Sequence, residues 1–416
     1  MEALERLGFT GFVSNKWNGE VKANYYNHEE FDFERDNKHN LYNNFTLGAI
    51  IEYIPNPTDG LKLSVNRDVY NKYLLLEQLK DKQKTYGNTF TNTRLTYAYE
   101  QVKNHKMLIG TEVFSEMLES DRFDASQGTS HSATDAVVFM QDEYTVNSSI
   151  TIVGGIRCGY HSAHKLHLSP SITVRLSKGD FSYRLSYARG FRSPTLKELY
   201  MSWTHQEMFT IYGNKNLKAE TSNYVSFSTE YMNTQRRISI TGYVAYNHIN
   251  NKIGGIWTNN QTEYNYKNKD EYKVLNAEML VRWKIFKPLQ VKTGYAYTKI
   301  LEDESITLLS STSPHSLSAQ LEYSYAKEWY NLSASITLKA IGKKSVSEFD
   351  AFVNNFYLSS YPSYSLINLN INQQFHKSYM VSIGIKNILN YTAPILSFNT
   401  TASVGRRFYI SVGYSF

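Results

Sequence analysis

The sequence contains few of the residues that crosslink or interrupt a chain, and it has no long apolar segment. Cys158 is the only cysteine among 416 residues, and prolines number 8. A single cysteine excludes an internal disulfide bond and any zinc site built from several cysteines. Because an α-helix needs about 20 consecutive apolar residues to cross a bilayer, a protein that spans a membrane with helices is excluded as well.

The sequence also lacks blocks of charge and the motifs of common enzymes. Its 44 basic and 38 acidic residues give a net charge of +6 and are scattered along the chain, which argues against nucleic-acid binding. There is no glycine-rich phosphate loop, zinc-type spacing of cysteine and histidine, or recognisable nucleophile motif, so we expect no enzymatic activity. The first residues, Met1 to Arg6, have no apolar core and do not form a secretory signal peptide.

Aromatic residues are abundant instead. Tyrosine occurs 34 times, aromatic residues make up 14% of the chain, and the mean hydropathy is −0.46. Disordered chains are poor in aromatic residues, which excludes that class. Collagen and coiled coils are excluded because neither periodic glycine nor heptads occur, which leaves a soluble all-β protein or a transmembrane β-barrel.

Apolar and polar residues alternate over long segments. The last segment is an example, with an apolar face formed by Phe408, Ile410, Val412, Tyr414 and Phe416. Successive side chains of a strand point to opposite faces, so such a strand has one apolar and one polar face. These segments run for about 10 residues or more and often end in tyrosine, as expected for strands that cross a bilayer between aromatic girdles. The pattern predicts an all-β fold, a transmembrane antiparallel β-barrel, rather than a soluble sandwich with shorter strands.

Short and long links alternate between the predicted strands. The short links are Pro55–Gly60, Lys103–His105, Asn147–Ser149, Ser177–Asp180, Asn233–Arg236, Lys287–Pro288, Lys327–Glu328 and His376–Ser378. The longer polar stretches are Leu76–Gly87, Leu118–Ala133, Phe191–Asn216, Asn250–Tyr266, Glu302–Pro314, Gly342–Pro362 and Tyr391–Gly405. Short periplasmic turns and long extracellular loops are typical of outer-membrane barrels, and we count about nineteen strands without a second domain. Helical turns are expected only at Tyr73–Lys80 and Thr195–Tyr200.

Two boxes of residues resemble motifs of the TonB-dependent outer-membrane receptors. The first follows a strand end and is similar to the family's Phe-Arg-Ala-Pro box, with its residues at Phe191, Arg192, Ser193 and Pro194. The second is similar to the family's Asn-Pro-Asn-Leu-Lys-Pro-Glu box, with matching residues at Gly213, Asn214, Asn216, Leu217 and Glu220. Serine replaces alanine in the first box, and Lys215 and Ala219 replace both prolines of the second.

The end of the chain adds two further resemblances. Gly384–Asn390 is similar to the penultimate strand of the family, and Phe416 resembles the terminal residue that barrel-assembly machinery recognises. Each element is weak alone, but four in the same order and spacing extend the resemblance over essentially the whole chain.

The resemblance implies a domain organisation. Receptor barrels of this family have about 22 strands, and counting around Pro194 places the start of this chain near the fourth strand. We therefore expect residues 1–416 to form a partial receptor barrel, with the signal peptide, the plug domain, the segment that contacts TonB and the first strands outside this chain.

The resemblance also implies a location, partners and a function. The barrel would lie in the lipid of the bacterial outer membrane, inserted by the barrel-assembly machinery and energised in the full-length receptor by the TonB–ExbB–ExbD complex. It would take up a scarce iron or metal chelate and carry no intrinsic cofactor. We expect haem as the ligand. The alternatives are a cobalamin or ferric-siderophore receptor, or a passive or non-functional truncated barrel.

The loop between the two boxes carries the candidate ligand-binding residues. In the haem-uptake branch of the family a histidine of this loop binds the haem iron, and His205 falls in a similar position. An imidazole is a good iron ligand, and neighbouring aromatic and methionine side chains can pack against a porphyrin. The predicted ligand-binding residues are Trp203, His205, Met208, Phe209 and Tyr212. The alternative is a solvated histidine in a loop that its aromatic residues anchor to the barrel rim.

Two further groups of residues have possible roles. Arg192 and Glu198 are predicted to form a structural ion pair at the base of the loop. His161, His164 and His167 are spaced so that a straight strand would point His164 away from the other two, and they would converge for metal binding only where the chain turns.

Overall fold

The chain is almost entirely β-structure. The computed structural model describes residues 2–32, 38–76, 81–123, 126, 128–205, 209–257, 262–301, 313–350, 355–393 and 404–415. These residues form twenty-three strands and one α-helix. Within them, no helix has the length and apolar character needed to span a membrane. The predicted all-β class is confirmed.

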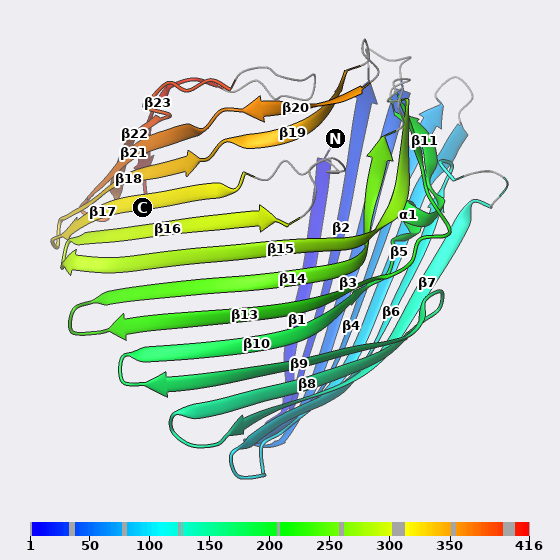
Figure 1. Cartoon of the computed structure of the whole chain (residues 1–416), viewed down its shortest axis with the longest axis horizontal. Helices are drawn as coiled ribbons and strands as arrows, with labels where there is room; N and C mark the ends of the chain where they lie inside the picture. Colours follow the sequence, from blue (N-terminus) through cyan, green and yellow to red (C-terminus); the bar gives the residue numbers. More distant parts are fainter. Residues whose placement is uncertain are drawn as a thin grey trace. The chain divides into compact units, whose positions relative to one another are not determined.

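The strands follow one another along the chain and are shown in Figure 1. The first ten are β1 (Glu2–Ser14), β2 (Trp17–Asp32), β3 (Lys38–Asn56), β4 (Asp59–Leu76), β5 (Asp81–Tyr99), β6 (His105–Ser120), β7 (Ser130–Thr145), β8 (Ile150–His161), β9 (Lys165–Lys178) and β10 (Phe181–Arg192). Next come α1 (Leu196–Tyr200), β11 (Ser202–His205), β12 (Phe209–Tyr212), β13 (Glu220–Asn233), β14 (Ile238–Trp257), β15 (Glu263–Phe286) and β16 (Leu289–Ile300). The last are β17 (His315–Ala326), β18 (Tyr330–Ile341), β19 (Lys344–Asp350), β20 (Asn355–Tyr361), β21 (Tyr364–Phe375), β22 (Tyr379–Lys386) and β23 (Arg407–Tyr414).

The strand count agrees with the alternation in the sequence. Nineteen strands correspond to the predicted ones, and the other four, β11, β12, β19 and β20, are short strands inside the predicted loops Phe191–Asn216 and Gly342–Pro362. Twenty-one strands belong to one hydrogen-bonded sheet, whereas β19 and β20 form a separate two-stranded sheet. The predicted short links all fall between successive strands, so the turn assignments are correct.

Several strands extend further into the predicted loops than expected. The helical turn proposed for Tyr73–Lys80 is wrong for the part that is described, because Tyr73 to Leu76 continue β4 and pair with β5. The reason is tertiary, since a registered partner strand stabilises the extended backbone more than a single helical turn stabilises itself. The helical turn at Thr195–Tyr200 is confirmed as α1.

The residues fall into two compact units. The first comprises Met1–Val174, Ser186–Tyr224 and Ile249–Tyr272, and the second comprises Arg175–Leu185, Val225–His248 and Lys273–Phe416. In the first unit β1 to β8 form a continuous antiparallel ladder. In the second unit the part of β15 that follows Lys273 pairs with β16. The antiparallel ladder then continues in the order β17, β18, β21, β22 and β23.

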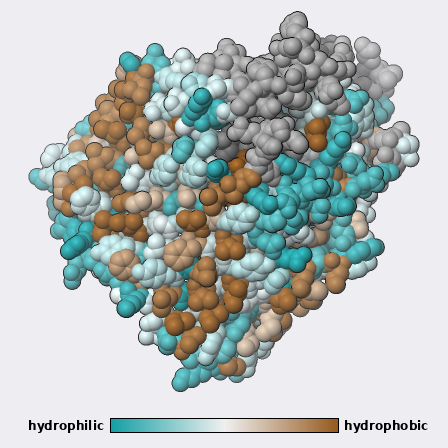
Figure 2. Space-filling model, in the orientation of Figure 1, coloured by the Kyte–Doolittle hydropathy of each residue, from teal (hydrophilic) through white to brown (hydrophobic). Residues whose placement is uncertain are grey.

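The apolar faces of the strands point to the outside. In β23 the side chains of Phe408, Ile410 and Val412 are 71%, 70% and 74% exposed. Only ten apolar residues are buried in the described part of the chain. Figure 2 shows apolar side chains gathered in patches on the surface. A soluble sandwich would bury these faces against a second sheet, so the exposure excludes it and fits strands that face lipid.

Candidate functional site

The base of the loop between β10 and β13 is an ordered turn of helix. Thr195 caps α1: its hydroxyl accepts a hydrogen bond from the backbone N–H of Glu198 (3.2 Å), and its own N–H donates to the Glu198 carboxylate (2.7 Å). This reciprocal pair satisfies two backbone donors at the start of the helix. Pro194, which precedes the cap, is buried. The first sequence box therefore ends β10 and starts a helix at a defined position.

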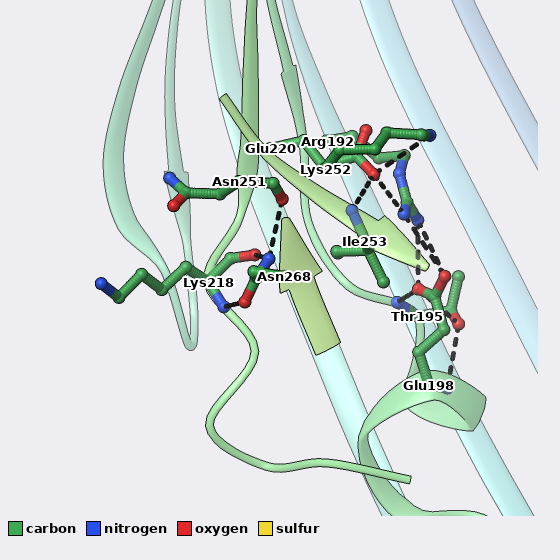
Figure 3. A network of polar contacts seen from close by, with 9 residues as sticks. All are labelled: Arg192, Thr195, Glu198, Lys218, Glu220, Asn251, Lys252, Ile253 and Asn268. Carbon is green, nitrogen blue, oxygen red and sulfur yellow. Dashed lines mark hydrogen bonds and ion pairs between the residues drawn. The ribbon is translucent and has the colours of Figure 1, made fainter. Parts of the chain in front are cut away.

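Arg192 joins the two sequence boxes. Its guanidinium donates to Glu198 through Nη1 (3.1 Å) and to Glu220 through Nη2 (2.8 Å), as Figure 3 shows. The ion pair predicted between Arg192 and Glu198 is thus present. The planar guanidinium can serve two carboxylates at once, which a lysine could not do with the same geometry.

Glu220 is the centre of this network. Its Oε1 atom accepts hydrogen bonds from Arg192, from Lys252 Nζ (3.3 Å) and from the backbone N–H of Ile253 (2.7 Å). Glu220 is 7% exposed, so its charge is removed from water and compensated by two cations and one amide. The start of β13, at Glu220, and the part of β14 around Lys252 are fixed to the end of β10 in this way (Figure 3).

Asparagines hold the second box. The side chain of Asn214 donates to the carbonyl of Tyr266 (3.0 Å) and accepts from the N–H of Asn216 (2.9 Å). Asn268 pairs with both backbone groups of Lys218, at 2.8 and 2.9 Å, and also donates to the carbonyl of Asn251 (2.7 Å). Figure 3 shows Asn268 between these two segments. The backbone of the second box is therefore bonded to β15 through side chains.

Apolar contacts complete the anchor. Leu199 of α1, Leu217 of the second box and Ile253 of β14 form one buried cluster. Leu196, one turn earlier in the short helix, packs with Leu118 and with other apolar residues in a second cluster. Gly213 is required where the chain passes α1, because a Cβ atom there would lie 2.7 Å from the backbone nitrogen of Tyr200.

The middle of the loop is a hairpin. β11 and β12 pair with His205 opposite Phe209, and β12 then pairs in parallel with β15, with Thr210 opposite Glu263. The ring of Phe209 meets the ring of Trp257 at 4.8 Å in an edge-on contact. Tyr212 is the last residue of β12 and its side chain is exposed. The sequence predicts this segment only as a loop, because strands of four residues are too short to show alternation.

The predicted ligand-binding residues are only partly described. The structure places the backbone of His205 at the end of β11 but does not describe its side chain, and Met208 lies outside the described residues. Trp203 lies under the guanidinium of Arg122, 4.4 Å from the ring centre. Phe416 is also outside the described residues. The assignment of Trp203, His205, Met208, Phe209 and Tyr212 to ligand binding stays a prediction.

The three histidines at and around the turn between β8 and β9 do not converge on one point. The chain turns at residues 162–164, so the rings of His161 and His164 approach to 5.2 Å. The Nδ1 atom of His161 accepts the backbone N–H groups of Ala163 and His164, each at 3.2 Å, while His167 contacts Asp135 at 2.9 Å and stacks on Phe191. Burial lowers the pKa of His164, and the neighbouring His161 lowers it further. Among the described residues no group of histidine, cysteine or acidic side chains has the geometry of a metal site.

Sequence reasoning missed part of the anchor. Lys252 and Asn268 follow the second box by more than thirty residues, and nothing in their local sequence distinguishes them from other polar strand residues. Only the pairing of the strands brings them to the loop. Glu220, in contrast, is recognisable as the last residue of a motif.

Comparisons with known proteins agree with the fold. The family model described as TonB dependent receptor-like, beta-barrel matches residues 5–388. The siderophore receptor PirA from Acinetobacter baumannii has a similar structure, with a TM-score of 0.77 at 15% identity over 100% of this chain and 71% of that chain. The FrpB iron transporter from Neisseria meningitidis gives a TM-score of 0.73 at 13% identity, and the match again covers 100% of this chain and 71% of that chain. A mutant of the ferric enterobactin receptor PfeA from Pseudomonas aeruginosa gives a TM-score of 0.65 at 14% identity, and the match covers 100% of this chain and 78% of that chain. No curated protein matches the sequence.

The matched family model extends over more than nine-tenths of the chain, including both boxes and the loop between them. Members of the family interact with TonB, and they bind the ligand that they transport rather than a resident cofactor. The chain therefore belongs to the TonB-dependent receptors, as an antiparallel β-barrel of the bacterial outer membrane that serves transport and is not an enzyme.

Proposed function

We propose that this barrel takes up an iron chelate from outside the cell, and that the loop from Thr195 to Ala219 forms part of its ligand-binding surface. The observation that carries the proposal is the anchor around Glu220, which fixes the two ends of the loop to the sheet while the β11–β12 hairpin lies between them. A loop held in one conformation binds a ligand at a smaller entropic cost. The similar structures whose names mention iron or siderophores support an iron chelate as the cargo.

Haem is the specific ligand that we propose. His205 would supply its imidazole to the iron, and Trp203, Met208, Phe209 and Tyr212 would pack around the porphyrin. Support comes from the register of the hairpin, which sets His205 opposite Phe209 at the tip of β11 and β12. Imidazole ligation changes the absorption of haem iron, so the interaction can be observed directly.

The test is a spectroscopic titration. Haemin is added to the purified 416-residue chain in detergent, and the Soret band is compared between the wild type, His205→Ala and His376→Ala. The control residue His376 lies in the turn between β21 and β22. We expect a shifted Soret band with the wild type and the control variant and a free-haemin spectrum with His205→Ala. Identical spectra for all three proteins remove His205 as the iron ligand.

A ferric siderophore is the second candidate ligand, supported by the siderophore receptors among the similar structures. It requires no histidine ligand because a siderophore already saturates its iron. Binding of a ferric siderophore that is unaffected by His205→Ala, together with a failure of haemin to bind, would favour this alternative. Ion conductance in planar bilayers without binding of any iron complex would instead indicate a passive pore.

A further inference from the structure

We propose that the lipid-facing side of β5 to β8 binds one molecule of phosphatidylethanolamine from the inner leaflet of the outer membrane. An apolar groove on this face takes an acyl chain, and Asp142 and His105 recognise the headgroup. The inference goes beyond the proposed function, because it requires the barrel to lie in the outer membrane and does not depend on which chelate is transported.

The groove has a volume of about 540 Å³ and an apolar lining. It crosses four strands that are neighbours in the ladder (Figure 1). Ile109, Met140 and Ile156 are registered partners on β6, β7 and β8, and all three side chains are exposed. The lining also includes Tyr97, Thr111 and Cys158. Because this face of the strands is in contact with lipid, the natural occupant of the groove is an alkyl chain of the bilayer.

A polar pair lies at the end of the groove that is nearest the short turns. Asp142 follows Met140 by two residues and His105 precedes Ile109 by four, so both side chains belong to the lipid face. The Nδ1 atom of His105 and the Oδ2 atom of Asp142 are 2.7 Å apart. The groove and the pair therefore form one continuous surface with an apolar and a polar end.

The pair is isolated in an otherwise uncharged surface. From Met107 to Met117 of β6 and from Ser132 to Met140 of β7, every residue on the lipid face is uncharged. Ionisable side chains that face the membrane are costly, and where they occur they indicate a functional site. We infer that His105 and Asp142 are present on this face because they bind a polar part of the lipid.

The carboxylate of Asp142 can accept a further hydrogen bond. Its Oδ2 atom contacts His105, whereas its Oδ1 atom is buried and has no partner among the described residues. Gly154 of β8 is registered opposite Asp142, and a Cβ atom at Gly154 would meet no other atom within 4 Å. The missing side chain leaves space beside the carboxylate for a small headgroup, whose donor would satisfy the Oδ1 atom.

The charges of the pair match a zwitterionic headgroup. The primary ammonium of ethanolamine has N–H donors for the Asp142 carboxylate. Since His105 donates to the carboxylate through Nδ1, its Nε2 atom remains for the lipid phosphate. Choline has no N–H group and glycerol has no positive charge, so phosphatidylcholine and phosphatidylglycerol lack the group that Asp142 would bind.

Aromatic residues beside the pair indicate its depth in the membrane. Tyr144 is registered with His105, and their rings stack with centres 4.5 Å apart. Tyr99 is registered with Met107, which is in turn registered with Asp142. Tyrosines of a barrel gather at the membrane–water boundary, and the short turns lie on the periplasmic side. The pair is therefore placed among the headgroups of the inner leaflet.

The test uses Cys158, the only cysteine of the chain, as a reporter inside the groove. The purified 416-residue chain is delipidated in detergent and then mixed with phosphatidylethanolamine, phosphatidylcholine or phosphatidylglycerol of identical acyl chains. The rate of Cys158 labelling by N-ethylmaleimide measures whether the groove is occupied. Native mass spectrometry counts the lipids that stay bound, and heat-modifiable migration on gels verifies that each protein is folded.

The variants separate the headgroup contact from the groove. Asp142→Asn removes the charge, His105→Gln removes the imidazole, and Gly154→Val fills the space beside the carboxylate. Glu143→Gln is the matched control for Asp142→Asn, because Glu143 is the next residue and belongs to the opposite face. Gly242→Val is the control for Gly154→Val, because Gly242 precedes the exposed Val244 by two residues and thus also lies on a lipid face.

We expect the wild type and both controls to retain one phosphatidylethanolamine, which slows the labelling of Cys158 more than the other two lipids do. Asp142→Asn and Gly154→Val should bind this lipid about 10-fold more weakly, because each loses the charge-assisted contact with the ammonium group. His105→Gln should also weaken binding, because the contact with the phosphate is lost. In all three variants the other two lipids should behave as they do with the wild type.

Three outcomes overturn the inference. Equal protection of Cys158 by the three lipids would show contact with lipid in general. Protection by phosphatidylethanolamine that is unchanged in Asp142→Asn and Gly154→Val would show that the pair does not bind the headgroup. Protection that rises with protein concentration in the absence of lipid would show that a second copy of the chain covers the groove. Each of these results leaves the uptake of an iron chelate untouched, since haemin binding is measured separately.

Discussion

Two loops of similar length differ in how they are held. The loop between β10 and β13 contains a capped helix and a hairpin, and β12 of that hairpin pairs with β15 of the main sheet. The loop between β18 and β21 also contains a hairpin, but within the described residues β19 and β20 pair with each other alone, in a sheet of their own. Both hairpins satisfy their internal backbone groups, yet in the part of the chain that the structure describes, the first alone is joined to the main sheet by strand pairing.

The difference corresponds to the side chains at the loop bases. The first loop is flanked by Arg192 and Glu220, whose charges meet once the strands pair. At the same positions of the second loop, the last residue of β18 is Ile341 and the first residue of β21 is Tyr364, and neither carries a charge. A hairpin needs only local hydrogen bonds to form, whereas a fixed position relative to a sheet needs contacts from distant segments. We infer that the first loop is organised for ligand binding before a ligand arrives.

The largest expected effect comes from removing the centre of the anchor. Glu220→Gln leaves Arg192 and Lys252 without their shared carboxylate, and we expect a loss of about 3 kcal/mol in the free energy of opening the loop. Limited proteolysis between residues 193 and 219 and hydrogen exchange of the Ile253 amide measure the change. Cleavage in the 342–363 loop should be unaffected, and Glu328→Gln, in an exposed turn, is the control. Equal cleavage of the first loop in both variants would contradict the anchor.

A somewhat smaller effect is expected from the apolar side of the anchor. Leu199→Ala removes a buried side chain that packs against Leu217 and Ile253, which costs about 2–3 kcal/mol in the free energy of opening the loop. Hydrogen exchange of the 193–219 segment reports the loss. Leu166→Ala, at a side chain that is 72% exposed, serves as the matched control. If both variants exchange alike, the cluster does not stabilise the loop.

The helix cap offers a finer test of the same comparison. Thr195→Ala removes the hydroxyl that accepts the Glu198 N–H, and we expect about 1 kcal/mol of destabilisation, confined to α1 and the following hairpin. Thr195→Ser retains the hydroxyl and should exchange like the wild type. If Thr195→Ala and Thr195→Ser destabilise the helix equally, the lost methyl group, and not the lost cap, is responsible.

The smallest effect concerns the tight turn between β8 and β9, which contains neither a helix nor additional strands. Burial lowers the pKa of His164 below its usual 6.5, so the neutral form is favoured when folded. The unfolded turn therefore binds a proton more readily, and the stability of the turn is full above about pH 6.5 and is lost as the pH falls through the folded pKa. Hydrogen exchange of the Ala163 amide, compared between pH 8 and pH 5, should show this change in the wild type and a weaker one in His164→Asn. The same pH dependence in both proteins would contradict the role of His164.

Much of the fold could be predicted from the sequence, and less of the site. Alternation identifies nineteen strands and their turns because each strand carries its own two-residue period. It missed β11 and β12, which have four residues each and too few positions for a period to show. It also placed a helical turn at Tyr73–Lys80, where pairing with β5 continues β4 instead.

The anchor illustrates the same division. Arg192 and Glu220 can be recognised because they belong to compact motifs, and the sequence predicts that Arg192 pairs with Glu198 at the base of the loop. The second partner, Glu220, follows Arg192 by 28 residues, and the pairing of the two depends on how β10 and β13 are placed. The interpretation of His161, His164 and His167 required knowledge of the turn, which brings two of them together and leaves His167 with Asp135 and Phe191.

The sequence by itself determined the strands, their apolar and polar faces and the order of turns and loops, because these follow from the covalent order of residues within each strand. The tertiary structure alone decided which distant side chains meet: Lys252 with Glu220, and Lys72 with Tyr42. Register is a relation between two strands, and a shift of a single residue would turn a row such as Tyr42, Lys72 and Tyr86 to the lipid face. The scarcity of cysteine, proline and long apolar runs excluded other folds, but the pairing of strands built the site.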